Sequence, residues 1–260
     1  LFDPVFARKA IDRLAAAAKK AAAKPRAVTH VGVGKAEVKE VASTRRVMGP
    51  DGKVKFVRYS ACRDPNVRAE PEGLIDPFVH TLAFFDGDEP VAVLTYYATH
   101  PQSYYGRGGV SCDFPGLARG RRDREQPGPM HVHFNGAGGN VTAGKYNDGA
   151  VENRMVLADR LADGMKRAYE SLKKEPIDAG KVSWRVVSAP LPCSKLYSTA
   201  DLKPRIADEK LKVADRLRLA RAYVWARRCE ASETIDMQCL QAGTAYVLLH
   251  HYMGEIDGAF

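Results

Sequence analysis

The 260-residue sequence has no apolar run that approaches the length of a membrane span, so no transmembrane span is expected. It also lacks an initiator Met and a signal-peptide pattern, and it opens in what resembles the middle of a helix. Internal repeats and low-complexity linkers are absent as well. We therefore expect a single domain over residues 1–260 that is a fragment of a longer chain. For such a fragment a missing signal peptide says nothing about export.

Closely spaced cysteines are also lacking. The five cysteines are far apart and form no C-x-x-C pair. Zinc fingers hold their metal through such pairs, so a site of that kind is not expected. An odd count leaves at least one thiol without a partner inside this chain, and buried or half-buried single cysteines are the favoured interpretation.

Acidic residues are fewer than basic ones, with 31 Asp and Glu against 40 Lys and Arg, a net charge of +9. The basic residues are scattered over segments that resemble solvated helix faces. Regular interleaving with aromatic residues, which would indicate a surface for stacking bases, is missing. The sequence therefore predicts no nucleic-acid partner.

Helix and strand signals alternate along a chain that is 45% hydrophobic and 27% charged, an ordinary globular composition. Helices are predicted over residues 5–24, 114–124 (with Asp113 as N-cap), 152–172 and 201–229, the last in one or two pieces. Strands are predicted over residues 27–33, 37–41, 78–85, 91–98, 130–134, 182–187, 235–240 and 244–251. The pattern predicts an α/β fold, a mixed β-sheet with helices on both faces.

A glycine-rich loop, Asn135–Gly149, follows the predicted strand 130–134. Glycine lets the backbone turn and lets a ligand approach, and a stretch this rich in glycine is not expected to build a core. Gly139–Lys145 fits the first seven positions of a phosphate-binding loop, G-x-x-x-x-G-K-[ST]. Tyr146 stands where a small hydroxyl should hold magnesium, which disfavours nucleotide binding. A plain strand–helix connection with a solvated loop remains an alternative.

Polar clusters end three of the predicted strands, where rigid strands hold loop residues in place. His100 follows strand 91–98, the glycine-rich loop follows strand 130–134, and Glu255 follows strand 244–251. A strand-terminal histidine can bind a metal or act as a base, or it can simply hydrogen-bond a backbone carbonyl. His131 and His133 share one face of their strand and are rival metal ligands. Spacing alone does not choose among these residues.

Taken together and in order, these segments resemble the neutral/alkaline non-lysosomal ceramidases, in particular their N-terminal catalytic domain and bacterial relatives. The segments that carry the resemblance are Thr44–Arg46, Gly73–Gly87 with the strand 91–98 that leads into His100, Ser111–Gly116, Asn135–Gly144 and Met253–Glu255.

The resemblance implies a zinc-dependent hydrolase that cleaves an acyl amide, with a ceramide-like lipid or related small molecule as substrate. His100 and Glu255 would bind the zinc ion, and Thr142 stands where the family has its catalytic serine. Arg45, with Gly139 and Asn140 of the loop, would bind substrate. The family's remaining zinc ligands, a His-x-His segment and a tyrosine, would lie before Leu1 and beyond Phe260.

The resemblance also implies contact with a membrane surface and a secreted or periplasmic location. Two departures from the family's loop weaken the match to ceramide itself. Asn140 stands where the family has an aspartate, so a negative charge is missing, and Thr142 stands where it has a serine, so a methyl group is added that restricts χ1. These departures fit a relative that acts on another acyl amide or ester. They also fit the alternative of a catalytically silent relative that binds lipid or glycan through the same cleft.

Overall fold

The computed structural model describes residues 3–106, 109–190 and 197–249. The described residues form two compact units that divide between Ala179 and Gly180, and each unit is described by itself. The single domain expected from the sequence stays a prediction, because compact units can belong to one domain or to two.

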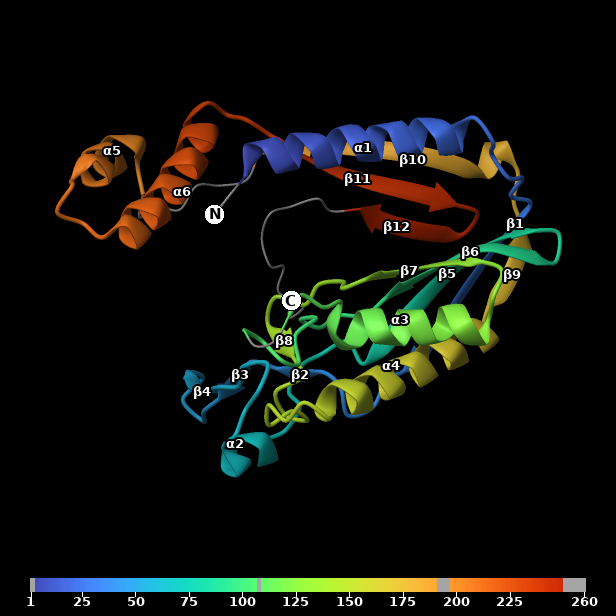
Figure 1. The fold of residues 1–260 in the computed structure, drawn as a ribbon, viewed down its shortest axis with the longest axis horizontal. Coiled ribbons are helices and arrows are strands. Elements are labelled where there is room, and N and C mark those ends of the chain that lie inside the picture. Colours follow the sequence, from blue (N-terminus) through green and yellow to red (C-terminus); the bar gives the residue numbers. More distant parts are fainter. Residues whose placement is uncertain (1–2, 107–108, 191–196, 250–260) are drawn as a thin grey trace. The chain divides into compact units, whose positions relative to one another are not determined.

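A five-stranded mixed sheet in the order β7-β6-β5-β1-β9 forms the framework of the first unit (Figure 1). Its strands are β1 (His30–Glu37), β5 (Phe78–Asp86), β6 (Glu89–Tyr96), β7 (Met130–Phe134) and β9 (Lys173–Pro176). Strands β6 and β7 run parallel, while the other neighbours are antiparallel. This mixed sheet confirms the predicted α/β fold, and the two predicted strands 27–33 and 37–41 prove to be mainly one strand, β1.

Helices α3 (Asp113–Glu125) and α4 (Asn153–Glu170) pack against each other and against the sheet. Apolar residues recur along α4 with helical spacing, and Leu157, Leu161 and Met165 are all buried. They meet Phe114 of α3 and Val79 of β5 in the main core cluster. The core therefore lies between this helical layer and the sheet.

Short elements complete the first unit. The two-residue strands β2 (Ser43–Thr44) and β8 (Val141–Thr142) pair, as do β3 (Arg46–Met48) and β4 (Val54–Val57). The remaining helices are α1 (Pro4–Ala22) and α2 (Pro65–Ala69). The Asp3 carboxylate caps α1 by accepting hydrogen bonds from the amides of Val5 and Phe6, and no residue of α1 is buried.

The second unit is built on an antiparallel three-stranded sheet, β10 (Val182–Ala189), β11 (Ile235–Ala242) and β12 (Ala245–Leu249), which follows a 3₁₀ turn at Ala179–Lys181. Strands β11 and β12 pair across the turn predicted from the sequence. The predicted helical segment 201–229 forms two helices, α5 (Thr199–Ala207) and α6 (Val213–Glu230).

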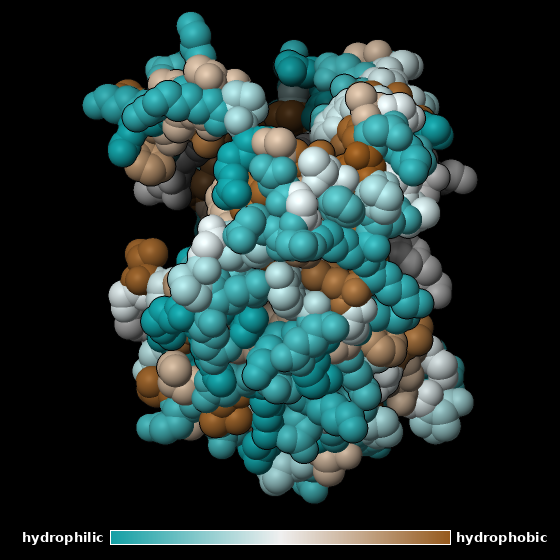
Figure 2. Space-filling view, turned by 90° about the vertical axis from the view of Figure 1, so that its right-hand side faces the viewer, coloured by the Kyte–Doolittle hydropathy of each residue, from teal (hydrophilic) through white to brown (hydrophobic). Residues whose placement is uncertain are grey.

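Two surface properties follow from the composition. None of the helices in residues 3–106, 109–190 and 197–249 combines the length and apolar character needed to cross a membrane. On the face shown in Figure 2, hydrophilic residues predominate and hydrophobic ones form small separate patches.

Candidate functional site

The parallel pairing of β6 and β7 places the segments after both strands side by side, because parallel strands end at the same edge of a sheet. The amide of Tyr97 donates to the Phe134 carbonyl over 3.1 Å, and the amide of His100 donates to the Val141 carbonyl over 2.9 Å. Two of the three polar clusters expected from the sequence, His100 and the glycine-rich loop, are thereby brought together.

Glycine is required in this loop where two backbones touch. A Cβ atom on Gly138 would lie 2.9 Å from the carbonyl carbon of Thr99, and one on Gly144 would lie 1.9 Å from the carbonyl oxygen of Tyr59. Between them, Val141 and Ala143 are fully buried members of the main core cluster. The expectation that the glycine-rich loop would not build a core is therefore wrong for its central part, because glycine allows it to pack tightly.

The His100 imidazole is held in one orientation. It is 9% exposed, and its Nδ1 lies 2.7 Å from the Gly138 carbonyl oxygen and 3.0 Å from that of Val141. Carbonyl oxygens only accept hydrogen bonds, so Nδ1 carries the proton and the lone pair of the neutral ring is on Nε2. Metal-bound histidines in proteins are commonly oriented by such a contact on their other nitrogen. The geometry is also that of a histidine satisfied by backbone carbonyls, and both interpretations remain compatible with it.

Arg45 lies against the same loop. Its backbone amide donates to the Asn140 carbonyl over 2.7 Å, and its Nη1 donates to the Gly139 carbonyl over 3.1 Å. Its guanidinium carbon stands 5.6 Å from the centre of the Tyr59 ring. The structure therefore brings Arg45, Gly139 and Asn140 together, as the sequence predicts, with Asn140 buried.

Thr142 lies in the interior of the protein. Its side chain is buried, and its Oγ1 donates to the Arg58 carbonyl at 3.2 Å or the Tyr59 carbonyl at 3.3 Å while accepting from the Gly144 amide at 3.3 Å. The hydroxyl is thus engaged with backbone. Glu255, the other expected zinc ligand, lies outside the described residues.

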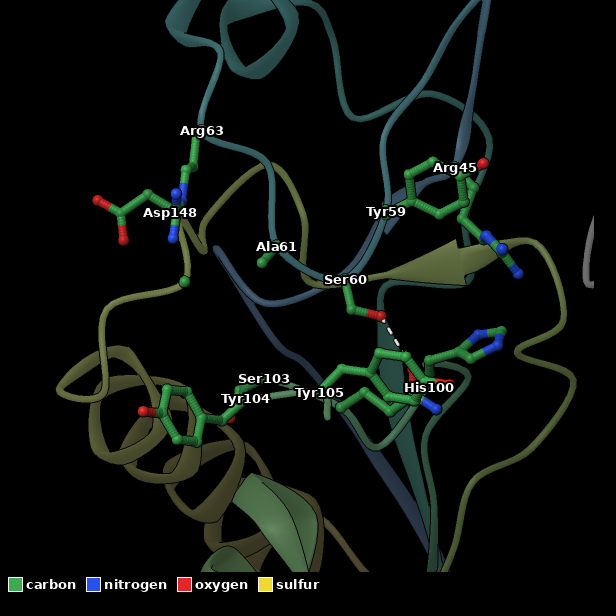
Figure 3. A pocket seen from close by; sticks show the side chains of 12 residues that line it. Arg45, Tyr59, Ser60, Ala61, Arg63, His100, Ser103, Tyr104, Tyr105 and Asp148 are labelled. Atoms are coloured by element: carbon green, nitrogen blue, oxygen red, sulfur yellow. Dashed lines mark hydrogen bonds between the residues drawn. The ribbon is translucent and has the colours of Figure 1, made fainter. Parts of the chain in front are cut away.

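A cavity of about 600 Å³ opens beside His100 (Figure 3). Its lining residues are Arg45, Tyr59, Ser60, Ala61, Arg63, His100, Gln102, Ser103, Tyr104, Tyr105, Asp148 and Gly149. Of the expected site residues that the structure describes, Arg45 and His100 line it, whereas Gly139, Asn140 and Thr142 do not. Sequence reasoning missed the stretch 59–63, which follows the unpredicted strand β4 and so gave no strand-end signal.

Two buried side chains hold the cavity's loops in place. Asn147 is fully buried and donates through Nδ2 to the carbonyls of Ser60 and Ser103, both at 2.7 Å. The Asp113 carboxylate accepts hydrogen bonds from the Ser103 amide at 3.0 Å and from its hydroxyl at 2.5 Å. Asp113 is the first residue of α3, and the N-cap is Cys112, so the predicted N-cap is off by one residue. The carboxylate of Asp113 fixes the loop that carries Ser103 and Tyr104.

Lys145 does not face a phosphate site. Its Nζ donates to the carbonyls of Arg68 at 2.8 Å and Glu70 at 2.6 Å, at the C-terminal end of α2. The neighbouring Tyr146 hydroxyl donates to the Glu72 carboxylate, and burial raises the pKa of this phenol. The resemblance of Gly139–Lys145 to a phosphate-binding loop is therefore accidental, since its lysine caps a helix.

The rival histidines of β7 have other partners. The Nδ1 of His133 lies 2.9 Å from the Thr95 hydroxyl, and burial lowers the pKa of His133 to about 4. Burial also lowers the pKa of His131, whose Nε2 lies 3.4 Å from the Gln126 carbonyl. Within residues 3–106, 109–190 and 197–249, no three His, Cys, Asp or Glu residues lie together as a metal site needs. The two histidines thus lack a third ligand in this part of the chain.

Comparison of the fold with solved structures finds neutral ceramidases. The chain is similar to the neutral ceramidase from Pseudomonas aeruginosa, with a TM-score of 0.50 and 12% identity over 85% of this chain and 39% of that one. It is likewise similar to a ceramidase complexed with C2, with a TM-score of 0.51 and 12% identity over 85% of this chain and 41% of the other.

These similarities establish a ceramidase-like fold, and the chain spans about two fifths of the length of the ceramidases it matches. No family model matches the sequence, and no curated protein matches it.

Proposed function

We propose that this chain is part of a zinc-dependent hydrolase that cleaves acyl amides. The observation that carries the proposal is the cavity in which His100, at the end of β6, lies beside Arg45 and the backbone of the glycine-rich loop. The similarity of the fold to neutral ceramidases supports the proposal.

The donor chemistry at His100 fits a zinc ligand. Imidazole nitrogen is a common zinc ligand, and the contacts of Nδ1 leave the lone pair on Nε2, the form that binds metal. Glu255 would be the second ligand, and catalytic zinc usually takes three from protein. When bound, zinc would polarise the amide carbonyl and lower the pKa of bound water to about 7.

Arg45 would bind the substrate carbonyl. Its guanidinium is already held by the Gly139 carbonyl and rests near the Tyr59 ring, so little freedom remains to be lost on binding. The Gly138 amide is not available to a substrate, because it donates to the Gly136 carbonyl at 3.1 Å. We therefore assign oxyanion stabilisation mainly to Arg45.

The role of Thr142 as nucleophile stays a prediction. Attack on a substrate would require Oγ1 to leave the carbonyls of Arg58 and Tyr59 and to become accessible. Thr142→Ser keeps the hydroxyl and Thr142→Val removes it at nearly constant shape. If Thr142 is the nucleophile, the serine variant retains turnover and the valine variant loses at least about 10³-fold. A purely structural role instead predicts reduced stability with turnover per folded molecule unchanged.

The proposal is tested on the full-length protein by zinc analysis and by hydrolysis of a fluorogenic N-acyl amide. His100→Ala is expected to lower bound zinc and to abolish hydrolysis. The control is His80→Ala, because His80 lies on β5 and is half exposed beside Asp76. A full-length protein without zinc whose hydrolysis survives His100→Ala would refute the proposal.

The buried hydroxyl of Thr142 favours a second candidate, a silent relative that binds lipid or glycan through the same cavity. Both candidate functions predict that the protein binds an N-acyl amide, but only the hydrolase is expected to cleave it. Saturable binding of an N-acyl amide without turnover, in both the natural protein and Thr142→Ser, would support the silent relative.

A further inference from the structure

The cavity beside His100 has a surplus of positive side chains. Arg45 and Arg63 line it, and Asp148 is the one carboxylate among its lining residues. Asp148 is itself turned toward the start of α4, where its Oδ1 accepts from the Ala150 amide at 2.9 Å and from Asn153 Nδ2 at 2.8 Å. These hydrogen bonds lower the pKa of Asp148, so it is ionised yet already occupied.

Arg63 is the cation whose role the fold does not explain. Among the residues that the structure describes it has no hydrogen bond and no ion pair, Asp148 included, and its side chain is exposed. Figure 3 shows Arg63 and Asp148 on one side of the cavity and Arg45 and His100 on the other. The positive field is strengthened by Arg68, whose charge reaches Asp148, and by Arg154, whose guanidinium lies 5.1 Å from the Tyr104 ring centre.

A substrate of the proposed hydrolase that fills the cavity would lie close to both Arg45 and Arg63. With its amide carbonyl at Arg45 and His100, one end of the molecule extends toward Arg63. A cavity of about 600 Å³ is large enough for a small amide with groups on both sides. Arginine presents a planar fork that matches a carboxylate, and such charge-assisted pairs are among the stronger hydrogen bonds. A dianion fits less well, because the ionised Asp148 stands nearby.

We propose that the substrate of this site carries a carboxylate on the amine side of its amide, as an N-acyl amino acid does, and that Arg63 binds this carboxylate. The inference rests on the proposed hydrolase function. Cleavage would break the amide C–N bond with addition of one water molecule. The acyl half leaves as a carboxylate, and the amino acid leaves as the zwitterion after its nitrogen takes up the protons.

Binding alone tests the inference. The probes are N-octanoylglycine and its methyl ester, in which a methyl group replaces the negative charge, and affinity is measured by isothermal titration on the full chain. The acid is expected to bind about fivefold to tenfold more tightly than the ester at low salt, and the difference should shrink at high ionic strength. Equal affinity for the two probes would overturn the proposal.

The variant pair Arg63→Gln and Arg124→Gln locates the effect. Both remove the positive charge of an exposed arginine. Arg124 does not line the cavity and lies in the last turn of α3, at the opposite end from Asp113, whose carboxylate holds the cavity loop at Ser103. Discrimination between acid and ester should disappear in Arg63→Gln and persist in Arg124→Gln. Loss in both variants, or in neither, would contradict the role of Arg63.

The outcome separates this inference from the proposed function. If the acid is preferred and Arg63-dependent but neither probe is hydrolysed by the zinc-loaded protein, the hydrolase proposal fails and the carboxylate site stands. If both probes are hydrolysed with equal kcat/KM, the hydrolase proposal stands and the carboxylate site fails.

Discussion

Gly144 occupies a point at which two backbone segments touch. A Cβ there would lie 1.9 Å from the Tyr59 carbonyl oxygen and 3.0 Å from Arg58 Cγ. Gly144→Ala should therefore lower the free energy of unfolding by about 2–3 kcal/mol, because a buried backbone atom has to move. The control is Gly120→Ala in α3, where the nearest atom is the flexible end of Arg124 at 3.8 Å.

Urea unfolding measures both variants. Gly120→Ala should gain up to about 1 kcal/mol from helix propensity, with a higher midpoint. A Gly144→Ala protein as stable as the parent would show that the two segments are not packed as described.

His133 couples stability to pH. Burial lowers its pKa to about 4 in the folded protein, whereas an unfolded histidine has a pKa near 6.5. Between these values the unfolded chain binds more protons than the folded one, so stability is highest above about pH 6.5 and falls as the pH drops toward 4. Between pH 7.5 and pH 5 we expect a loss of about 1–2 kcal/mol from this residue.

His133→Gln should remove that part of the pH dependence, since glutamine does not titrate. The comparison is made by urea unfolding at pH 7.5 and pH 5 for the parent and the variant. His80→Gln serves as control because His80 is half exposed and pairs with Asp76. An identical pH dependence in the parent and in His133→Gln would contradict the assignment.

At the scale of elements, the five-residue helix α2 depends on cations that bind its last carbonyls. Arg58 is fully buried, and its guanidinium donates to the carbonyls of Val67, Glu70 and Pro71 at 2.9–3.3 Å. Further bonds reach the Thr44 and Glu72 carbonyls. The arginine thus connects α2 to the segments that frame the cavity.

Arg58→Met should cost about 3–5 kcal/mol, because it leaves several buried carbonyl oxygens without donors. The urea midpoint should fall at an unchanged m value. Arg124→Met, at an exposed position, should change stability by less than about 0.5 kcal/mol. Similar losses in both variants would argue against the described network.

At the scale of the whole molecule, the two compact units should differ in local stability. The main core cluster lies in the first unit, whereas most residues of β10 are exposed, including Trp184 and Val187. Amide hydrogen exchange should therefore be slowest in β1, β5 and β6 and faster in β10. Slower exchange in β10 than in β5 would show that the second unit is stabilised by contacts outside the described residues.

Elements set by local pattern could be predicted. Helical spacing of Leu157, Leu161 and Met165 predicted α4, and alternating turn and strand signals predicted the β5–β6 hairpin and β7. Each of these elements is formed by residues close together in the sequence, so the spacing of its apolar residues and its turn residues are enough to predict it. The α/β class followed from their order.

The candidate site was only partly predictable. Arg45, His100 and Gly139 lie together as the ordered motifs indicated, whereas Thr142 is engaged with backbone carbonyls and Glu255 lies outside the described residues. Strands β2 and β8 are two residues each, too short for any periodic signal, and their pairing joins segments about 100 residues apart. No sequence pattern reports such a contact.

The sequence by itself determined the longer helices and strands and their order, because those depend on local backbone and side-chain chemistry. Only the tertiary structure decided what the glycine-rich loop does. Glycine allowed the loop to pack against the segments at Thr99 and Tyr59, and this packing turned Lys145 toward α2 and buried Thr142. It also brought Arg63 to the cavity of His100, since close packing of distant segments determines which side chains meet.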